Sequence, residues 1–242
     1  MNSLNEQFIS IFEPVLALKG FKRKRNIFHR LIKKEIIQIF SIKKFSGGSF
    51  TMQYLIIPVC SGEEIAMPLD ENRIGDLVGN ETLWEWDIDE NVEQNLLEAL
   101  DVCKKYLFKC FDYVKNYETY YDFILKMHKQ SLYRLSEVYK QENEKLLKVP
   151  RAIGFYEVCL CLGEYQTAIS SLETMFCQRT EAMQYNKKHG CRPTKRAINV
   201  LNDITAQINK TKNFQNGICS PYEELEKKKY TTLNSYFKHF GI

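Results

Sequence analysis

Residues 27–59 read IFHRLIKKEIIQIFSIKKFSGGSFTMQYLIIPV, and this stretch decides the fold. Three runs rich in β-branched and aromatic residues predict strands over 26–32, 35–44 and 50–59. The polar pair Lys33-Lys34 separates the first two runs, and Ser46-Gly47-Gly48-Ser49 separates the second from the third. Short turns of this kind join antiparallel neighbours, so the stretch predicts an antiparallel meander.

A helix is predicted on the N-terminal side of these strands, over residues 3–18. Ser3 and Glu6 have the spacing of a capping box, and apolar residues then recur at helical intervals. Gly20 suits the position just after the helix, whereas Pro14 inside it predicts a kink or a restart. The apolar side of this helix is expected to pack on one face of the meander.

The period of the apolar pattern changes after the third strand. Short strands are expected near 65–69 and 83–88, and from about residue 90 the period is helical. One long helix is predicted from Val92 to Cys110, with an apolar face that includes Leu96, Cys103 and Tyr106. Further helices are predicted over 118–128, 130–147, 151–162, 165–185, 193–210 and 221–239. The fold class is therefore α+β, with an α+β domain over 1–115 and an all-α region of helical hairpins over 116–242.

Short motifs in the first half resemble those of a known bacterial family. They are Leu18-Lys19-Gly20-Phe21-Lys22-Arg23-Lys24, Ile27-Phe28-His29-Arg30, Arg73-Ile74-Gly75-Asp76-Leu77 and Leu83-Trp84-Glu85-Trp86. Over roughly residues 1–115 the chain resembles domain of unknown function 4304. The resemblance implies a small α+β fold, and it implies no reaction for any residue. The helical extension after it departs from the family pattern.

Composition excludes several classes of protein. The chain is 44% hydrophobic and 13% aromatic, which is too apolar for a disordered protein. Its longest apolar runs are too short to cross a bilayer, and its start lacks the pattern of a signal peptide. A cytoplasmic, reducing location is therefore expected, with free cysteines packed as small hydrophobes on helical faces at Cys103, Cys110, Cys159 and Cys177.

Charge is unevenly distributed along the chain, although the net charge is only +4. Residues 1–34 carry 8 Lys and Arg against 2 acidic residues, whereas residues 63–101 carry 13 acidic residues against Arg73 alone. Such segregation indicates either an internal electrostatic fit or a surface shaped for a charged partner.

The acidic segment is the leading candidate for a binding site. An acidic surface with aromatic anchors suits a basic protein partner, and the candidate residues are Trp84, Trp86, Asp87, Asp89 and Glu90. An immunity-type inhibitor of a basic toxin is one form of this prediction. Two structural alternatives stay open: the tryptophans belong to the core, and the acids stabilise a helix N-terminus.

The basic segment supports a second hypothesis, nucleic-acid binding through phosphate contacts. Its candidate residues lie between Lys19 and Lys34 and are Lys22, Arg23, Lys24, Arg25 and Arg30. The structural alternative is a solvated turn and an edge strand protected by charge.

Catalytic and metal-binding motifs are not found in the sequence. The four histidines are scattered, and no paired CxxC, HExxH, P-loop, GxGxxG or GxSxG is present. We therefore predict no metal, no cofactor and no catalytic residue, and a non-catalytic protein whose partner is another protein. An enzyme with a site assembled in space stays as a third hypothesis.

Overall fold

The computed structural model describes residues 3–65, 72–75, 85–138 and 153–242, and for residues 128–138 it describes the backbone alone. The strands are β1 (Lys22–Lys24), β2 (Ile27–Ile32), β3 (Ile36–Lys44), β4 (Ser49–Pro58), β5 (Asn72–Arg73) and β6 (Trp86–Asp87). The first half also contains α1 (Leu4–Leu18), the short turn η1 (Val59–Ser61), α3 (Val92–Val102), the π-helical turn η2 (Cys103–Leu107) and α4 (Phe108–Tyr113). The second half contains α5 (Tyr117–Val138), α6 (Phe155–Leu162), α7 (Tyr165–Lys188), α8 (Lys195–Gln215) and α9 (Tyr222–Phe240).

The sheet is antiparallel in the order β1-β2-β3-β4-β5, and β6 also pairs with β4. This confirms the predicted meander. The turn between β2 and β3 is tight because Lys33 and Lys34 both have positive φ, of 50° and 58°, and the Glu35 N–H donates to the Ile32 carbonyl at 2.9 Å. Positive φ at both central positions is the requirement of a type I′ hairpin turn.

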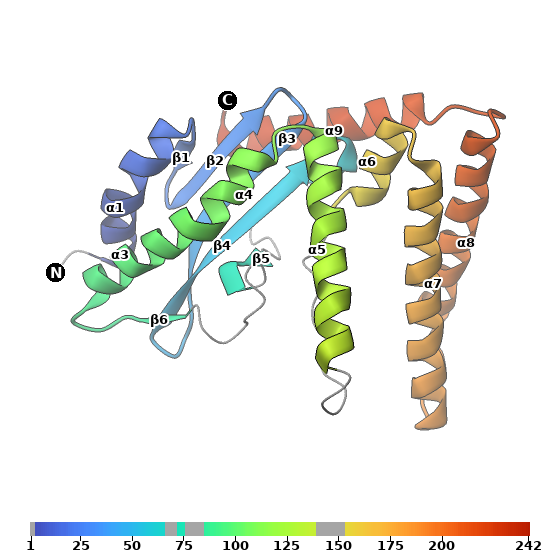
Figure 1. Ribbon diagram of the computed structural model, residues 1–242, viewed down its shortest axis with the longest axis horizontal. Helices are drawn as coiled ribbons and strands as arrows, with labels where there is room; N and C mark the ends of the chain where they lie inside the picture. Colours follow the sequence, from blue (N-terminus) through green and yellow to red (C-terminus); the bar gives the residue numbers. More distant parts are fainter. Residues whose placement is uncertain (1–2, 66–71, 76–84, 139–152) are drawn as a thin grey trace.

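Helices α1, α3 and α4 cover one face of the sheet, as Figure 1 shows. Helix α1 begins with the predicted capping box between Ser3 and Glu6, and it is continuous through Pro14 to Leu18. Phe40 lies at the centre of the interface and is fully buried. Its ring contacts four other aromatic rings, those of Phe8, Phe12, Phe28 and Phe108.

Helix α9 lies on the other side of the sheet, behind β2 and β3 in Figure 1. Tyr236 and Phe240 of this helix pack in a second apolar cluster with four strand residues, which are Ile37, Ile39, Leu55 and Ile57. The sequence analysis expected cover on one face only. Because both faces are covered, all seven residues from Ile36 to Ile42 are buried, and the core of the sheet includes residues from both halves of the chain.

The helical second half agrees with the prediction in class and differs in its boundaries. A single helix, α5, replaces a predicted break near residue 129, because the sequence there contains neither Gly nor Pro to end a helix. Helix α6 begins at Phe155, later than predicted, directly after Gly154 at a φ of 66°. The predicted hairpin around Gly163 is present, with Ala168 fully buried where α6 meets α7. The expected strand near 65–69 falls largely outside the described residues.

The aromatic cluster predicts a strong effect of Phe40→Ala. Removing a fully buried ring leaves a cavity among four other rings, so we expect a loss of about 3–5 kcal/mol in the free energy of unfolding. Chemical denaturation followed by circular dichroism measures this loss. Leu18→Ala is the matched control, because Leu18 is 91% exposed and its truncation should change stability by less than about 0.5 kcal/mol. Equal effects of the two substitutions would contradict this account of the core.

Candidate functional site

The two tryptophans of the acidic segment do not form an exposed pair in the described structure. Trp86 is only 6% exposed, and its ring stacks on that of Phe50 at a centroid distance of 5.7 Å. It is therefore a core residue, and the prediction that it is an exposed anchor for a partner is corrected. Trp84 lies outside the described residues.

The acidic residues that follow Trp86 are exposed and lead into α3. The side chains of Asp87, Asp89 and Glu90 all face solvent. Asp89 Oδ1 accepts a hydrogen bond from the backbone N–H of Asn91, the residue that precedes α3, at 2.9 Å. Carboxylates near a helix N-terminus are stabilised by the helix dipole. These acids thus help to start the helix, and their exposure leaves them accessible to a partner as well.

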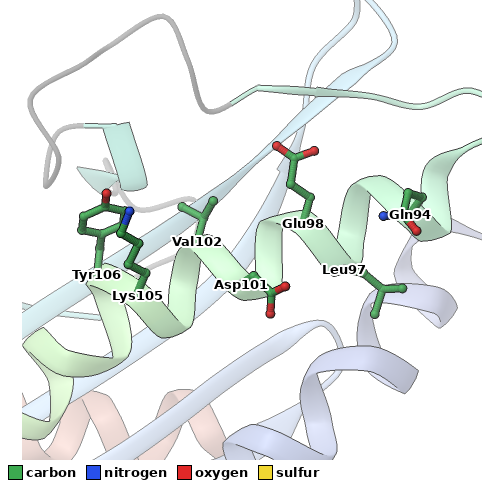
Figure 2. A pocket seen from close by; sticks show the side chains of 7 residues that line it. All are labelled: Gln94, Leu97, Glu98, Asp101, Val102, Lys105 and Tyr106. Atoms are coloured by element: carbon green, nitrogen blue, oxygen red, sulfur yellow. The ribbon is translucent and has the colours of Figure 1, made fainter.

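A shallow hollow of about 350 Å³ lies along the exposed side of α3 and continues onto the π-helical turn (Figure 2). Its lining residues recur at intervals of three and four along the helix, which places them on one face. They are Gln94, Leu97, Glu98, Asp101, Val102, Lys105 and Tyr106. The opposite face of α3 is buried through Leu96, Ala99 and Leu100. We call the exposed face, together with Asp87, Asp89 and Glu90, the α3 surface.

The hollow combines apolar and acidic groups. Leu97 is 42% exposed, and Val102 is half-buried. The carboxylates of Glu98 and Asp101 also line the hollow, and Asp101 is paired with Lys104 across one helical turn at 3.1 Å. An exposed ion pair of this kind contributes little to stability, so the Asp101 carboxylate stays available to other cations.

The π-helical turn explains why Tyr106 lines this hollow. Tyr106 and Leu107 were both predicted on the apolar face of the helix; Leu107 is buried there, whereas Tyr106 is half-exposed. A π-turn accommodates one more residue than an α-helical turn, and it therefore rotates the side chains within it. Lys105 lies over the Tyr106 ring at 5.0 Å, which extends the hollow with a cation and an aromatic edge.

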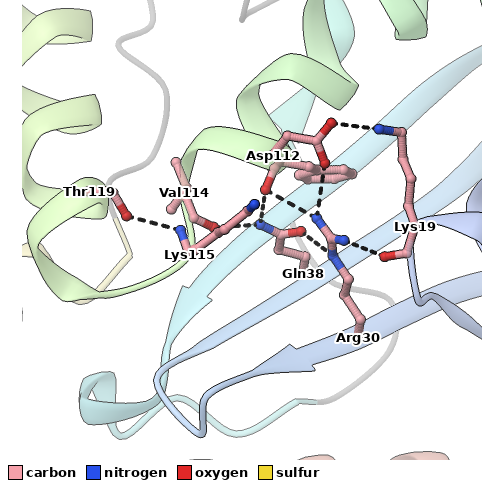
Figure 3. A network of polar contacts seen from close by, with 8 residues as sticks. Lys19, Arg30, Gln38, Asp112, Val114, Lys115 and Thr119 are labelled. Carbon is pink, nitrogen blue, oxygen red and sulfur yellow. Dashed lines mark hydrogen bonds and ion pairs between the residues drawn. The ribbon is translucent and has the colours of Figure 1, made fainter.

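The basic segment is engaged with the rest of the fold, and Arg30 is its clearest case (Figure 3). The Arg30 guanidinium donates to Gln38 Oε1 at 2.7 Å, to the Phe111 carbonyl at 3.1 Å, and to the Lys19 carbonyl. Its Nη2 also lies 3.7 Å from Asp112, and its side chain is only 12% exposed. The prediction that Arg30 binds a phosphate is therefore corrected: Arg30 joins β2 to the end of α4.

The other four basic candidates lie on or beside the edge strand β1 and are exposed. Arg23 forms an ion pair with Glu13 at 2.8 Å, and the Lys24 ammonium donates to the His239 carbonyl. Lys22 and Arg25 extend into solvent between these contacts. Within the described ranges, the ion pairs of the basic segment go to Glu13 and Asp112, and none goes to the acidic segment over 63–101.

One histidine is buried. His29 Nδ1 and the Tyr236 hydroxyl lie 2.8 Å apart, and the imidazole stacks on Phe240 at 3.6 Å. Burial, with added repulsion from Lys22, His239 and Lys24, lowers the pKa of His29 to about 4. The ring is therefore neutral at physiological pH and serves to hold α9 on the sheet.

The buried cysteines behave as hydrophobes, as the sequence analysis expected for three of them. Burial raises the pKa of Cys110 and Cys159 to about 12 each, and it also raises the pKa of Cys103 well above its usual range. Such thiols are poor nucleophiles at neutral pH. Cys177 is exposed, so its predicted place on a buried helical face is wrong. Among the described residues, no group of three or more His, Cys, Asp or Glu side chains could hold a metal ion.

No protein-family model, curated protein or solved structure matches this chain. The relationship to domain of unknown function 4304 therefore stays a prediction. No helix in the described part of the chain is both long and apolar enough to cross a lipid bilayer.

Sequence reasoning located the acidic segment and missed the hollow next to it. The signal was present in Leu97, an apolar residue that does not fit the buried spacing of its own helix. A large apolar side chain between Glu98 and Glu93 of the preceding turn indicates an exposed apolar spot within an acidic surface.

The network in Figure 3 predicts that Arg30→Gln destabilises the protein by about 2–3 kcal/mol. The substitution removes charge-assisted bonds to carbonyls of two other segments and leaves the Phe111 carbonyl with fewer donors. Urea denaturation measures the loss. Arg25→Gln removes the same charge from an exposed position and should change stability by less than about 0.5 kcal/mol. An Arg30→Gln protein as stable as Arg25→Gln would show that the network is not structural.

The lowered pKa of His29 predicts a specific pH dependence of stability. Between pH 6.5 and about 4 the unfolded chain binds a proton that the folded protein does not, so the contribution of the neutral ring is complete above pH 6.5 and lost as the pH falls. The loss amounts to at most about 3 kcal/mol.

The measurement is the free energy of unfolding at pH 7, 5.5 and 4 for the native protein and for His29→Gln. We expect the native protein to lose more stability than the variant over this interval, because the carboxylates titrate equally in both. His189→Gln, at an exposed histidine, should follow the native curve. Parallel curves for the native protein and His29→Gln would contradict the assignment.

Proposed function

We propose that this protein is a non-catalytic binding module that uses the α3 surface to hold a basic segment of another protein. The observation that carries the proposal is the hollow on α3, which exposed Leu97 lines together with the carboxylates of Glu98 and Asp101. A lysine or arginine side chain matches this chemistry, because its aliphatic stem covers an apolar surface while its charge meets a carboxylate.

The charges of the α3 surface support a partner of opposite sign. Asp87, Asp89 and Glu90 precede the hollow, and Glu98 and Asp101 border it. Surfaces of one sign accelerate the encounter with a complementary partner and reject partners of like charge. An immunity-type inhibitor of a basic toxin is the specific form of this function that we favour. The same charges disfavour nucleic acid as the ligand of this surface.

The other two hypotheses have less support from the described residues. Arg30, Arg23 and Lys24 are occupied by contacts within the fold, which leaves the basic segment with few free cations for phosphates. Burial raises the pKa of the Cys110 and Cys159 thiols, which disfavours these two residues as nucleophiles.

Charge reversal on α3 tests the proposal. The double variant Glu98→Lys/Asp101→Lys replaces both carboxylates that border the hollow. We expect it to bind a fluorescent leucine–lysine helical peptide at least about tenfold more weakly than the native protein, measured by anisotropy at 50 mM salt. A protein captured from the source cells by chemical cross-linking to the native chain should likewise be lost from the variant.

The matched control is Glu173→Lys/Glu181→Lys, which makes the same change of charge at exposed positions on α7. It should bind the peptide and the captured protein as the native chain does. Because all four carboxylates are on exposed positions, the thermal unfolding curves of both variants should stay close to the native one. Equal weakening by the two double variants would show that net charge, and not the α3 surface, determines binding, and would contradict the proposal.

A further inference from the structure

The turn between α7 and α8 is the most basic part of the second half of the chain. Five Lys and Arg residues fall within ten positions, and all five side chains are exposed; they are Lys187, Lys188, Arg192, Lys195 and Arg196. Residues 185–196, which we call the hairpin tip, contain no acidic residue. In the described part of the chain, none of the five cations is paired with a carboxylate.

The hairpin tip projects away from the sheet, as Figure 1 shows. Helix α7 has 24 residues and is therefore about 36 Å long. Its buried residues are Ala168, Ile169 and Leu172, all in its first third, and the first buried residue of α8 is Ile204. Between Leu172 and Ile204 no side chain is buried, so this part of the hairpin contributes little to the core of the protein.

We propose that the hairpin tip binds the sugar–phosphate backbone of single-stranded nucleic acid. Each Lys or Arg that contacts a phosphate releases condensed counterions, and five such contacts give appreciable affinity at low salt. The five cations repel one another, and the tip contains no acidic residue to offset this repulsion. An anionic ligand therefore explains their clustering better than the stability of the fold does.

Two of these cations lie at the end of a helix where positive charge is unfavourable. Lys195 and Arg196 occupy the first turn of α8, which has no acidic residue. Helices prefer carboxylates at this end, because the dipole is positive there. Stability of the helix alone therefore disfavours this arrangement, whereas a polyanionic ligand favours it.

An aromatic pair lies among the cations. Tyr185 is 58% exposed, and the His189 ring lies 4.2 Å from it at an interplanar angle of 34°. The His189 Nδ1 lies 2.8 Å from the Tyr185 carbonyl oxygen, to which it donates in the Nδ1-protonated tautomer, and this contact holds the ring in place. Bases of single-stranded nucleic acid stack on exposed aromatic rings beside a basic surface.

The backbone holds the tip in a defined shape. Helix α7 ends in a Schellman motif, in which the Cys191 N–H donates to the Asn186 carbonyl at 2.9 Å and Gly190 has a φ of 82°. The Thr194 hydroxyl then accepts from the Ala197 N–H at 3.2 Å and begins α8. The cations are thus attached to two helix ends of fixed direction, which lowers the entropy lost on binding.

Nucleic acid fits this surface better than an anionic membrane does. Binding in a membrane interface needs an apolar face that enters the lipid, and Tyr185 is the only large apolar residue of the tip. The phosphodiester chemistry is shared by RNA and DNA, so the experiment includes both. The tip lies at the opposite end of the molecule from α3 in Figure 1 and has the opposite charge, so this proposal does not depend on the proposed function.

The test measures binding of fluorescent 20-nucleotide single-stranded RNA and DNA to the full chain by anisotropy. Five phosphate contacts on a single strand predict that affinity falls about 100-fold between 50 and 200 mM salt. The tip variant Lys187→Gln/Lys188→Gln/Arg192→Gln/Lys195→Gln/Arg196→Gln should bind at least about 30-fold more weakly at 50 mM salt. Tyr185→Ala should weaken binding of the single strands about tenfold and leave binding of a duplex unchanged.

The matched control removes five exposed cations from the sheet: Lys22→Gln/Arg25→Gln/Lys33→Gln/Lys34→Gln/Lys44→Gln. It has the same net charge as the tip variant and should keep at least half of the native affinity. Circular dichroism should show the native helix content in both variants, because every substituted side chain is exposed. Three results would overturn the proposal: equal weakening by the control, no binding of either strand at 50 mM salt, or tip-dependent binding of phosphatidylserine vesicles alone.

Discussion

Burial of β3 on both faces is the constraint on which the rest of the structure depends. Each residue from Ile36 to Ile42 is buried. Helices α1, α3 and α4 cover one face of the strand, and α9 packs on the other. A polar group in such a strand must find its partners inside the protein, because leaving it unpaired costs about 1–3 kcal/mol. Gln38 is in this position, and its amide donates to the carbonyls of Phe111 and Val114 at 3.0 and 2.8 Å. These carbonyls lie at the C-terminal end of α4, where helical partners run out, so the buried Gln38 side chain satisfies groups that the helix leaves unpaired.

The same constraint joins the two halves of the chain. The outer face of β2 and β3 requires an apolar cover, and α9 supplies it from the C-terminal end of the sequence through Tyr236 and Phe240. His29 becomes a neutral buried ring because α9 lies over it. Protonation of His29 in acid would therefore weaken the packing of α9 on the sheet as well as the sheet itself. A boundary near residue 115 consequently lies between two helices, α4 and α5, and it does not separate two independent cores.

Local patterns predicted the elements well, and they failed where a contact spans a long distance in the sequence. The strand over 50–59, the Lys33-Lys34 turn and the Ser3–Glu6 cap each depend on neighbours in the sequence, so each was predictable. The pairing of His29 with Tyr236 spans 207 positions, and no periodicity contains that information. Arg30 and Trp86 looked like surface residues because their sequence neighbours are charged, yet both are held by the fold. Tyr106 was misplaced for a different reason: a π-turn changes the helical period that the prediction assumed.

These contacts change the meaning of the charge segregation in the sequence. The basic segment over 19–34 includes β1 and β2 of the sheet, and Glu13, Asp112 and backbone carbonyls engage several of its cations. Because these cations have partners within the fold, the fold explains why they cluster. By contrast, the acids of the α3 surface and the cations of the hairpin tip are exposed, and within the described residues few of them have a partner in the fold; Asp101 pairs with Lys104, and Asp89 accepts from the Asn91 N–H at the start of α3. Like charges on an exposed surface repel one another. An oppositely charged ligand therefore explains their clustering better than the stability of the fold does. Contacts with the rest of the fold, and not the local sum of charge along the sequence, are therefore what distinguish the basic segment from the two surfaces on which we base function.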